Sequence, residues 1–185
     1  GWTIIVPVKT LERAKSRLAP EFSPGRRRAL VVAMATDVVT ACRDATLVGR
    51  VRVVGSDPEI ARIAQELGAE FVVDPTGTPT VPSATAVPAC FVTEDPLNSA
   101  LTHAMAGVRG PVGVVAADLP ELSSLLLTEV LAAAARHPHS VVTDHRGDGT
   151  TMAFWTGPGD RVNHFGAGSA DRFRHLGGAE EIAVD

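Results

Sequence analysis

The stretch VRVVGSDPEIARIAQELGAEFVV, residues 51–73, decides the fold of this chain. Its two ends, Val51–Val54 and Phe71–Val73, are short runs of β-branched and aromatic side chains, which favour strands. Between them, Asp57 followed by Pro58 is typical of a helix start, and Gly68 is typical of a helix end. A strand, a helix and a second strand in such close succession predict two parallel strands joined by a crossover helix.

The same alternation continues on both sides of this stretch. The apolar run at residues 3–8, TIIVPV, predicts a buried strand, and Ser23 before Pro24 predicts a helix that extends to about Cys42. Further helices are expected from Pro96 and after Ser123, and further strands at residues 111–117, 140–144 and 151–155. We therefore predict a single α/β domain over residues 1–185, in three layers around a doubly wound, mostly parallel sheet.

Residues 75–94 differ in composition from the rest of the chain. Threonine, proline and small residues dominate here, without the period of a helix or a strand. This composition predicts a long flexible surface loop.

Composition and charge exclude several classes of protein. The 185 residues are 45% hydrophobic, which suits one core, and the net charge of −4 disfavours binding to nucleic acid or to an anionic membrane. No apolar run approaches the ~20 residues of a membrane span, and the first residues do not resemble a signal peptide, so we predict a soluble, cytoplasmic protein. Cys42 and Cys90 lie far apart without a C-x-x-C motif, which disfavours a disulfide framework or a zinc site.

The two lysines of the chain, Lys9 and Lys15, both lie in the loop expected after the first strand. Residues 1–28 carry seven basic side chains against Glu12 and Glu21, whereas the remainder of the chain is acidic. Lysine is a compact, mobile point charge that suits contact with a phosphate. This loop is therefore a candidate anion site, and a solvated basic helix start without a ligand is the alternative.

Ligands of doubly wound sheets gather at the carboxyl ends of the strands. Three polar features follow predicted strands in this way: Lys9, Asp118, and the turn that contains Gly147, Gly149 and Thr150. Neither G-x-x-x-x-G-K-[ST] nor a G-x-G-x-x-G after a strand occurs, which disfavours a P-loop phosphatase or a nicotinamide enzyme.

Six short motifs occur in a fixed order over nearly the whole chain. They are Val6-Pro-Val-Lys9, Ala14-Lys-Ser-Arg-Leu18, Pro96-Leu-Asn98, Asp118-Leu-Pro120, Gly147-x-Gly-Thr150 and Phe165-Gly166-x-x-Ser169. This ordered set resembles the CofC-type guanylyltransferases, and most closely their actinobacterial branch, which uses phosphoenolpyruvate.

The resemblance implies a nucleotide-diphospho-sugar transferase fold of the glycosyltransferase-A kind, related to the enzymes that attach GMP to molybdopterin. It implies transfer of GMP from GTP to the phosphate of a small phosphoacid, with release of pyrophosphate, in the biosynthesis of coenzyme F-420. Phosphoenolpyruvate is the expected acceptor, and 2-phospho-L-lactate or 3-phosphoglycerate are the family's others. Neither nucleic acid nor a membrane is expected as a partner, and a homodimer is left open.

The resemblance also assigns residues to the nucleotide. Lys9, Lys15 and Arg17 would face the triphosphate of GTP, with both lysines counted as catalytic. Asp118 would be a catalytic residue that binds Mg²⁺, and Asn98 would hydrogen-bond the base or the ribose. An ordinary helix-start carboxylate is the alternative for Asp118, and an ordinary helix-start amide is the alternative for Asn98.

The resemblance assigns acceptor binding to a second group of residues. Thr150, Gly166 and Ser169 would form the pocket for the acceptor carboxylate, where small residues expose backbone N–H groups to an anion. As turn formers, they could equally be turn residues only. The family places a histidine four positions after the serine, whereas here Phe173 stands at that position and His175 follows it.

Other features are less informative or depart from the family. His137 and His139 flank Pro138 and are expected to be a solvated loop pair. The D-x-D-x-P segment that supplies a second metal carboxylate in the family does not occur before Asp185, so a C-terminal segment is expected to be missing. A non-catalytic nucleotide-binding or interaction module of the same fold, and a molybdopterin or sugar-phosphate nucleotidyltransferase, are the competing interpretations.

Overall fold

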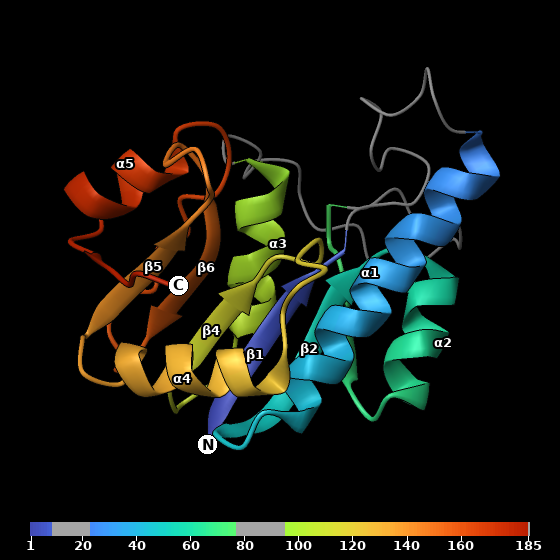
Figure 1. Cartoon of the computed structure of the whole chain (residues 1–185), viewed down its shortest axis with the longest axis horizontal. Coiled ribbons are helices and arrows are strands. Elements are labelled where there is room, and N and C mark those ends of the chain that lie inside the picture. Colours follow the sequence, from blue (N-terminus) through green and yellow to red (C-terminus); the bar gives the residue numbers. More distant parts are fainter. Residues whose placement is uncertain (9–22, 77–94, 185) are drawn as a thin grey trace.

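The computed structural model describes residues 1–8, 23–76 and 95–184, and within them the strands form one seven-stranded sheet (Figure 1). The strands are β1 (Trp2–Pro7), β2 (Val48–Gly55), β3 (Glu70–Val73), β4 (Val112–Val115), β5 (His139–Thr143), β6 (Thr150–Trp155) and β7 (Glu180–Glu181). The helices are α1 (Pro24–Asp44), α2 (Pro58–Glu66), α3 (Pro96–Met105), α4 (Ser124–Ala134) and α5 (Ser169–His175).

The strand order is β3-β2-β1-β4-β6-β5-β7. The strands β1 to β4 pair in parallel, whereas β6 runs antiparallel to both of its neighbours, β4 and β5. The chain moves outward from β1 to β2 and β3, then returns to place β4 on the other side of β1. The order therefore reverses between β1 and β4, and ligands of α/β sheets bind at such a reversal.

Capping side chains start the first four helices. Ser23, Asp57, Asp95 and Ser123 each accept a hydrogen bond from a backbone N–H of the helix that follows, with donor–acceptor distances of 3.4, 2.9, 2.9 and 3.1 Å. Three of these helices also have proline in their first turn. The helix starts predicted at Pro24, at Pro58, at Pro96 and after Ser123 are confirmed.

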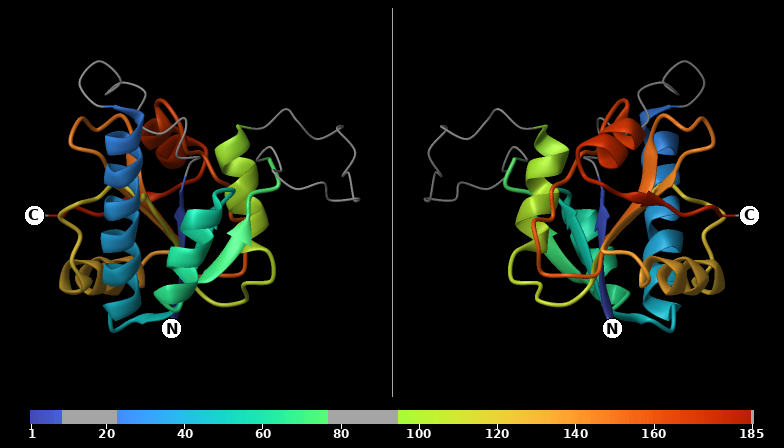
Figure 2. Two further views of the ribbon diagram at one scale, coloured as in Figure 1. Left: turned by 90° about the vertical axis from the view of Figure 1, so that its right-hand side faces the viewer. Right: turned by 90° about the vertical axis from the view of Figure 1, so that its left-hand side faces the viewer.

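Two helical layers cover the sheet, as the mostly parallel order requires. One core packs α1, α2 and α4 against one face, and a second core packs α3 and α5 against the other. Figure 2 shows α1 and α4 on one side of the sheet and α3 on the opposite side. The predicted three-layer α/β architecture is confirmed.

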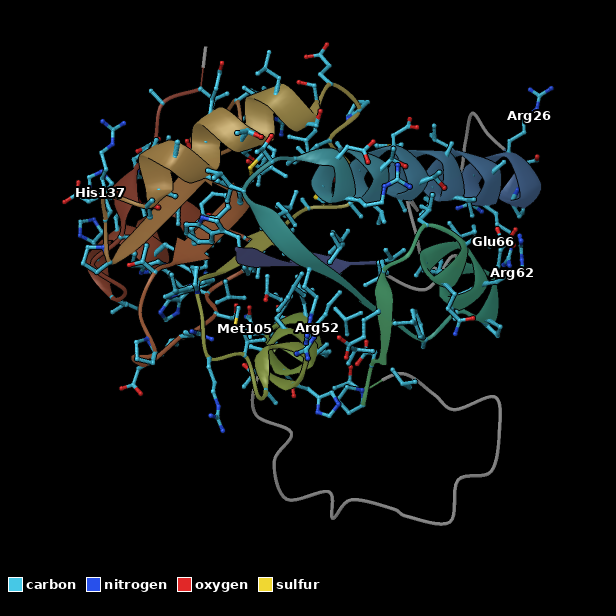
Figure 3. All side chains as sticks on the ribbon, turned by 90° about the horizontal axis from the view of Figure 1, so that it is seen from below. Arg26, Arg52, Arg62, Glu66, Met105 and His137 are labelled. Carbon is cyan, nitrogen blue, oxygen red and sulfur yellow. The ribbon has the colours of Figure 1, made fainter. Side chains whose placement is uncertain are left out.

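Arg52 of β2 fixes the C-terminal end of α3. Its guanidinium donates to the carbonyls of Ala104 at 2.8 Å and Ala106 at 3.1 Å, which are among the carbonyls that a helix end leaves unpaired. Figure 3 shows Arg52 beside the end of α3 near Met105. With Asp95 at its other end, α3 is held at both ends, and this helix carries Asn98.

The structure adds to the predicted elements and corrects some bounds. β4 ends at Val115, because the chain beyond it leaves the sheet after Ala116 donates to the carbonyl of Thr151. α5 and β7 were not predicted, since both are short. No helix of the described residues is long and apolar enough to cross a membrane. Most of the loop at 75–94, including Cys90, lies outside the described residues.

Candidate functional site

A pocket of about 760 Å³ opens where the strand order reverses. Val8 after β1, Asp118 after β4, Asp144 after β5, and Thr150 and Ser169 contribute to its walls. Its remaining lining is largely apolar and includes side chains of α1. A cavity of this size, apolar with a few polar groups, is typical of a small-molecule site.

Asp118 lies three residues beyond the end of β4 and lines this pocket. The helix that follows, α4, is capped by Ser123, whose side chain accepts from Leu126 N–H. Because Ser123 performs the capping, a helix-cap role does not explain the position of Asp118. Ligands collect at such a switch point, and Asp118 does line the pocket, while its role as a ligand or metal contact stays a prediction.

The turn between β5 and β6 is organised by Asp144. Backbone N–H groups of Arg146 and Asp148 donate to one oxygen of its carboxylate at 3.1 and 3.2 Å. Desolvation opposes ionisation of Asp144, but these N–H groups and that of Gly149 outweigh it and lower its pKa. Gly149 is required, because a Cβ there would lie 2.5 Å from the Asp144 carboxylate. This turn sets the start of β6.

Thr150 and Ser169 meet across the pocket wall. The Ser169 hydroxyl donates to the Thr150 hydroxyl at 3.0 Å, and Ser169 is only 1% exposed. The N–H of Ala170 donates to the carbonyl of Asp148, which ties the start of α5 to the β5–β6 turn. Gly166 also lines the pocket, with a φ of +125° that favours glycine. The structure thus brings the three predicted acceptor residues together, while their role stays a prediction.

Asn98 lies in α3, behind Phe165, and does not contribute to the described lining of the pocket. Its Nδ2 donates to the Phe165 carbonyl at 3.0 Å, and its Oδ1 accepts from the Phe165 N–H at 2.9 Å. Both ends of the amide therefore hold the backbone beside the pocket. A contact of Asn98 with the base or ribose stays a prediction. What the structure shows is that its amide binds the Phe165 backbone.

The predicted triphosphate residues Lys9, Lys15 and Arg17 lie outside the described residues. Val8, immediately before Lys9, lines the pocket. The residue that immediately precedes the lysine-bearing segment therefore belongs to the pocket wall.

His139 corrects one expectation from the sequence. It belongs to β5, stacks on Trp155 with a ring separation of 4.7 Å, and has Nδ1 3.0 Å from the Gly177 carbonyl. Burial lowers its pKa. The expectation of a solvated loop residue was wrong here, because the strand begins one residue after Pro138.

The carboxylates in the pocket lining are Asp118 and Asp144, and no group of three His, Cys, Asp or Glu residues in the described part of the chain is arranged to hold a metal. Such a set does not fit a metal held entirely by protein. It does fit Mg²⁺, which usually takes one or two carboxylates and completes its shell with water and substrate phosphates. Asp118 is a candidate because it follows β4 at the sheet reversal and lines the pocket.

Sequence reasoning missed two residues that shape this site. Asp144 was placed where a strand meets a glycine-bearing turn, but its side chain was not recognised as the group that holds this turn, although an aspartate followed by glycines is a signal for it. Arg172 of α5 was not singled out, and it donates to the carbonyls of His164 at 3.0 Å and Ala167 at 2.6 Å. No local sequence signal identifies such a residue, because its partners are backbone groups that only the fold brings near.

Comparison with known sequences places the chain in one family. The family model described as "Guanylyl transferase CofC like" matches residues 2–184. The phosphoenolpyruvate guanylyltransferase of Streptomyces scabiei is 41% identical over 186 residues, covering 97% of this chain and 79% of that protein. That of Mycolicibacterium gilvum is 39% identical over 180 residues, covering 96% and 78% respectively.

Comparison with solved structures supports the fold alone, because the sequence identities are low. A protein of Desulfovibrio desulfuricans G20 described as a nucleotide-diphospho-sugar transferase has a TM-score of 0.64 at 13% identity, covering 98% of this chain and 78% of that one. Rv0371c of Mycobacterium tuberculosis H37Rv has a TM-score of 0.55 at 17% identity, covering 100% and 88%. A manganese complex of Rv0371c matches with a TM-score of 0.54.

Proposed function

The chain belongs to the family of CofC-like guanylyl transferases, and from this premise we propose that it transfers GMP from GTP to the phosphate of phosphoenolpyruvate. The observation that carries the proposal is the pocket at the sheet reversal, whose lining includes Asp118, Thr150, Gly166 and Ser169. These are the positions at which the resemblance expects the metal and the acceptor. Coenzyme F-420 biosynthesis is the pathway in which we place the activity.

The reaction brings two polyanions together. An acceptor phosphate oxygen attacks the α-phosphorus of GTP, a new P–O bond forms, and the bond to the β-phosphate oxygen breaks with its electron pair leaving on pyrophosphate. The protein must hold both substrates in line and balance the charge that develops on the leaving group. A largely apolar pocket strengthens each electrostatic contact made inside it.

Asp118 is our candidate for the Mg²⁺ ligand. Bound there, Mg²⁺ would neutralise phosphate charge and polarise the α-phosphoryl group. Asp118 places its carboxyl group in the pocket lining, three residues beyond the buried strand β4. Lys9, Lys15 and Arg17 are our candidates for the remaining triphosphate contacts. The resemblance also expects Asn98 to contact the base or ribose, but both ends of its amide already bind the Phe165 backbone, so we do not assign the nucleotide to it.

Thr150, Gly166 and Ser169 are our candidates for the acceptor side. The Thr150 hydroxyl accepts from Ser169 and keeps its own proton to donate to a carboxylate, and Gly166 allows close approach to its backbone. This part of the lining would then bind the acceptor carboxylate, so that the acceptor phosphate could extend toward the nucleotide. This arrangement suits a short phosphoacid with one carboxylate.

The competing interpretations receive less support. The named relatives that cover nearly all of this chain are guanylyltransferases, which does not favour a non-catalytic module. A molybdopterin or sugar-phosphate nucleotidyltransferase typically has a glycine-rich L-x-G-G-x-S-x-R-M segment after its first strand, where this chain has Val6-Pro-Val-Lys9.

A substrate panel tests the proposal. The protein is incubated with Mg²⁺, with GTP or ATP, and with phosphoenolpyruvate, 2-phospho-L-lactate or 3-phosphoglycerate, and pyrophosphate is measured. We expect release with GTP and phosphoenolpyruvate, and a guanylylated product by mass spectrometry. Release only with ATP, or no release with any phosphoacid, would contradict the proposal, whereas preference for 2-phospho-L-lactate would change only the acceptor.

A further inference from the structure

The segment His164–Ala167, which we call the acceptor loop, is held by its carbonyl groups. Phe165 C=O accepts from Asn98, and Gly166 C=O accepts from Ser169 N–H at 3.1 Å. The carbonyls of His164 and Ala167 accept from Arg172. Four consecutive carbonyls therefore each have a hydrogen-bond donor from the protein.

Asn98 and Arg172 approach this loop from different helices. Asn98 projects from α3 and pairs with both backbone groups of Phe165. Arg172 projects from α5, and its Nη2 also lies 3.5 Å from the Phe165 carbonyl. The Phe165 side chain is buried and meets Phe173 edge to face at 5.1 Å. The Phe165 peptide is thus fixed by its side chain and by two helices.

Fixing the Phe165 carbonyl also fixes the next N–H. The described chain has no cis peptide bond, so the C=O of one residue and the N–H of the next point in opposite directions. Because the Phe165 carbonyl points at Asn98 and Arg172, the N–H of Gly166 points away from both. Gly166 lines the pocket, and a Cβ there would approach Arg172 at 3.3 Å and Asp95 at 3.4 Å.

We propose that Asn98 and Arg172 are positioning residues for the acceptor, acting through the Phe165 peptide to aim the Gly166 N–H at the acceptor anion. This inference rests on the proposed function, and it gives Asn98 a role distinct from nucleotide contact. Because such a hydrogen-bond donor is oriented before the anion binds, little conformational entropy is lost on binding. Loss of the positioning residues weakens acceptor binding and leaves GTP binding unchanged.

The chain contains a matched control for each residue. Asn163 is also an asparagine that joins the same loop region to α3, but its amide meets Thr102 at 3.3 Å and Met105 Sδ at 3.7 Å, not the acceptor loop. Arg161 is also an arginine that binds backbone carbonyls, those of Val108 and Gly110, at the opposite end of the sheet. The controls lose the same chemical group without touching the Gly166 N–H.

Two-substrate kinetics test the proposal with the variants Asn98→Ala, Asn163→Ala, Arg172→Lys and Arg161→Lys. We expect Asn98→Ala and Arg172→Lys to raise the KM for phosphoenolpyruvate by about 10-fold, as loss of one to two hydrogen bonds implies, with the KM for GTP within about twofold. Both controls should keep both KM values. Asn98→Asp, which preserves shape but places an anionic oxygen against the Phe165 carbonyl, should resemble Asn98→Ala.

Hydrogen exchange gives a readout that does not need turnover. Amides of residues 165–169 should exchange faster in Asn98→Ala than in Asn163→Ala, and added phosphoenolpyruvate should slow them in the parent at lower concentrations than in Asn98→Ala. A raised KM for GTP alone, equal effects of the controls, or unchanged exchange in Asn98→Ala would overturn the inference. A parent that releases no pyrophosphate contradicts the proposed function, and exchange with and without phosphoenolpyruvate still decides the inference.

Discussion

The strand β4 connects two ends of the sheet that differ in what surrounds them. At its carboxyl end lies the pocket, with Asp118 and Ser169 in its lining. At its amino end, Arg161 donates to the carbonyls of Val108, Gly110 and Gly157 at 2.7 to 3.2 Å. Both ends satisfy loop carbonyls with protein donors, but only the carboxyl end also places polar groups in the lining of a cavity. Stability and chemistry should therefore respond to different substitutions along one strand.

Asp118→Asn should give the largest effect and should be confined to the pocket end. The substitution keeps the shape and one acceptor oxygen but removes the charge that we assign to Mg²⁺ binding. We expect turnover to fall by at least about 10²-fold, comparable with the loss of one transition-state stabiliser, while the melting temperature changes little. Steady-state pyrophosphate release and thermal unfolding measure the two effects. Full activity in this variant would show that the carboxylate has no part in the reaction.

Gly113→Ala should affect stability instead of chemistry. Gly113 lies in β4, and a Cβ there would approach Phe154 at 2.6 Å and Ile4 at 3.0 Å. We expect the free energy of unfolding to fall by about 1–3 kcal/mol through overpacking, with the KM values of the folded protein retained. Gly110→Ala is the control, because a Cβ there meets nothing within 4 Å. Equal urea midpoints for the two variants would contradict this reading of the core.

Arg161→Ala sharpens the comparison at the amino end. The substitution removes the guanidinium that donates hydrogen bonds to three loop carbonyls, and water can replace these hydrogen bonds only in part. We expect a loss of about 1–2 kcal/mol in the free energy of unfolding, with the KM values for both substrates unchanged. Urea denaturation and steady-state kinetics check both statements. A selective rise in one KM would mean that the two ends are coupled.

His139 should give the smallest effect, visible only in the pH dependence of stability. Burial lowers its pKa below the ordinary value of 6.5, so the folded state binds fewer protons than the unfolded state as the pH falls through 6.5. Stability is therefore greatest above this value and declines below it. Neighbouring His164, whose pKa burial also lowers, acts in the same direction, and Arg172 adds positive charge nearby.

The measurement compares the parent with His139→Gln. Between about pH 7 and about pH 5, we expect the parent to lose up to about 1 kcal/mol more of its free energy of unfolding than the variant does. Parallel curves for the two proteins would show that His139 does not contribute to this dependence.

The sequence predicted those elements whose signals are local. The β-branched runs and the caps at Ser23, Asp57 and Ser123 located strands and helices, because capping depends on neighbouring residues. The mostly parallel sheet also followed, since alternating strands and helices favour parallel pairing, but the strand order and the antiparallel β6 were not predicted. α5, with seven residues, escaped prediction because tertiary contacts rather than an amphipathic pattern hold a helix of that length.

The site was predicted in part for the same reason. Asp118 and Thr150 could be selected because they follow or begin strands, where ligands collect. Their neighbours could not be predicted, because Asn98 and Arg172 act on backbone carbonyls 67 and 8 residues away. Asparagine at a helix start resembles a ligand in sequence, and only the structure shows that its amide is engaged with Phe165.

The division of the pocket into a nucleotide side and an acceptor side is tested most directly by equilibrium binding. Dissociation constants for GTP with Mg²⁺ and for phosphoenolpyruvate are measured by calorimetry on Asp118→Asn and on Ser169→Ala. We predict that Asp118→Asn weakens only GTP binding. We predict that Ser169→Ala weakens only phosphoenolpyruvate binding, by about fivefold to 10-fold, because the Thr150 hydroxyl loses the hydrogen bond that orients it. The division would be contradicted if both variants bound the same ligand more weakly, or if neither variant bound either ligand more weakly than the parent.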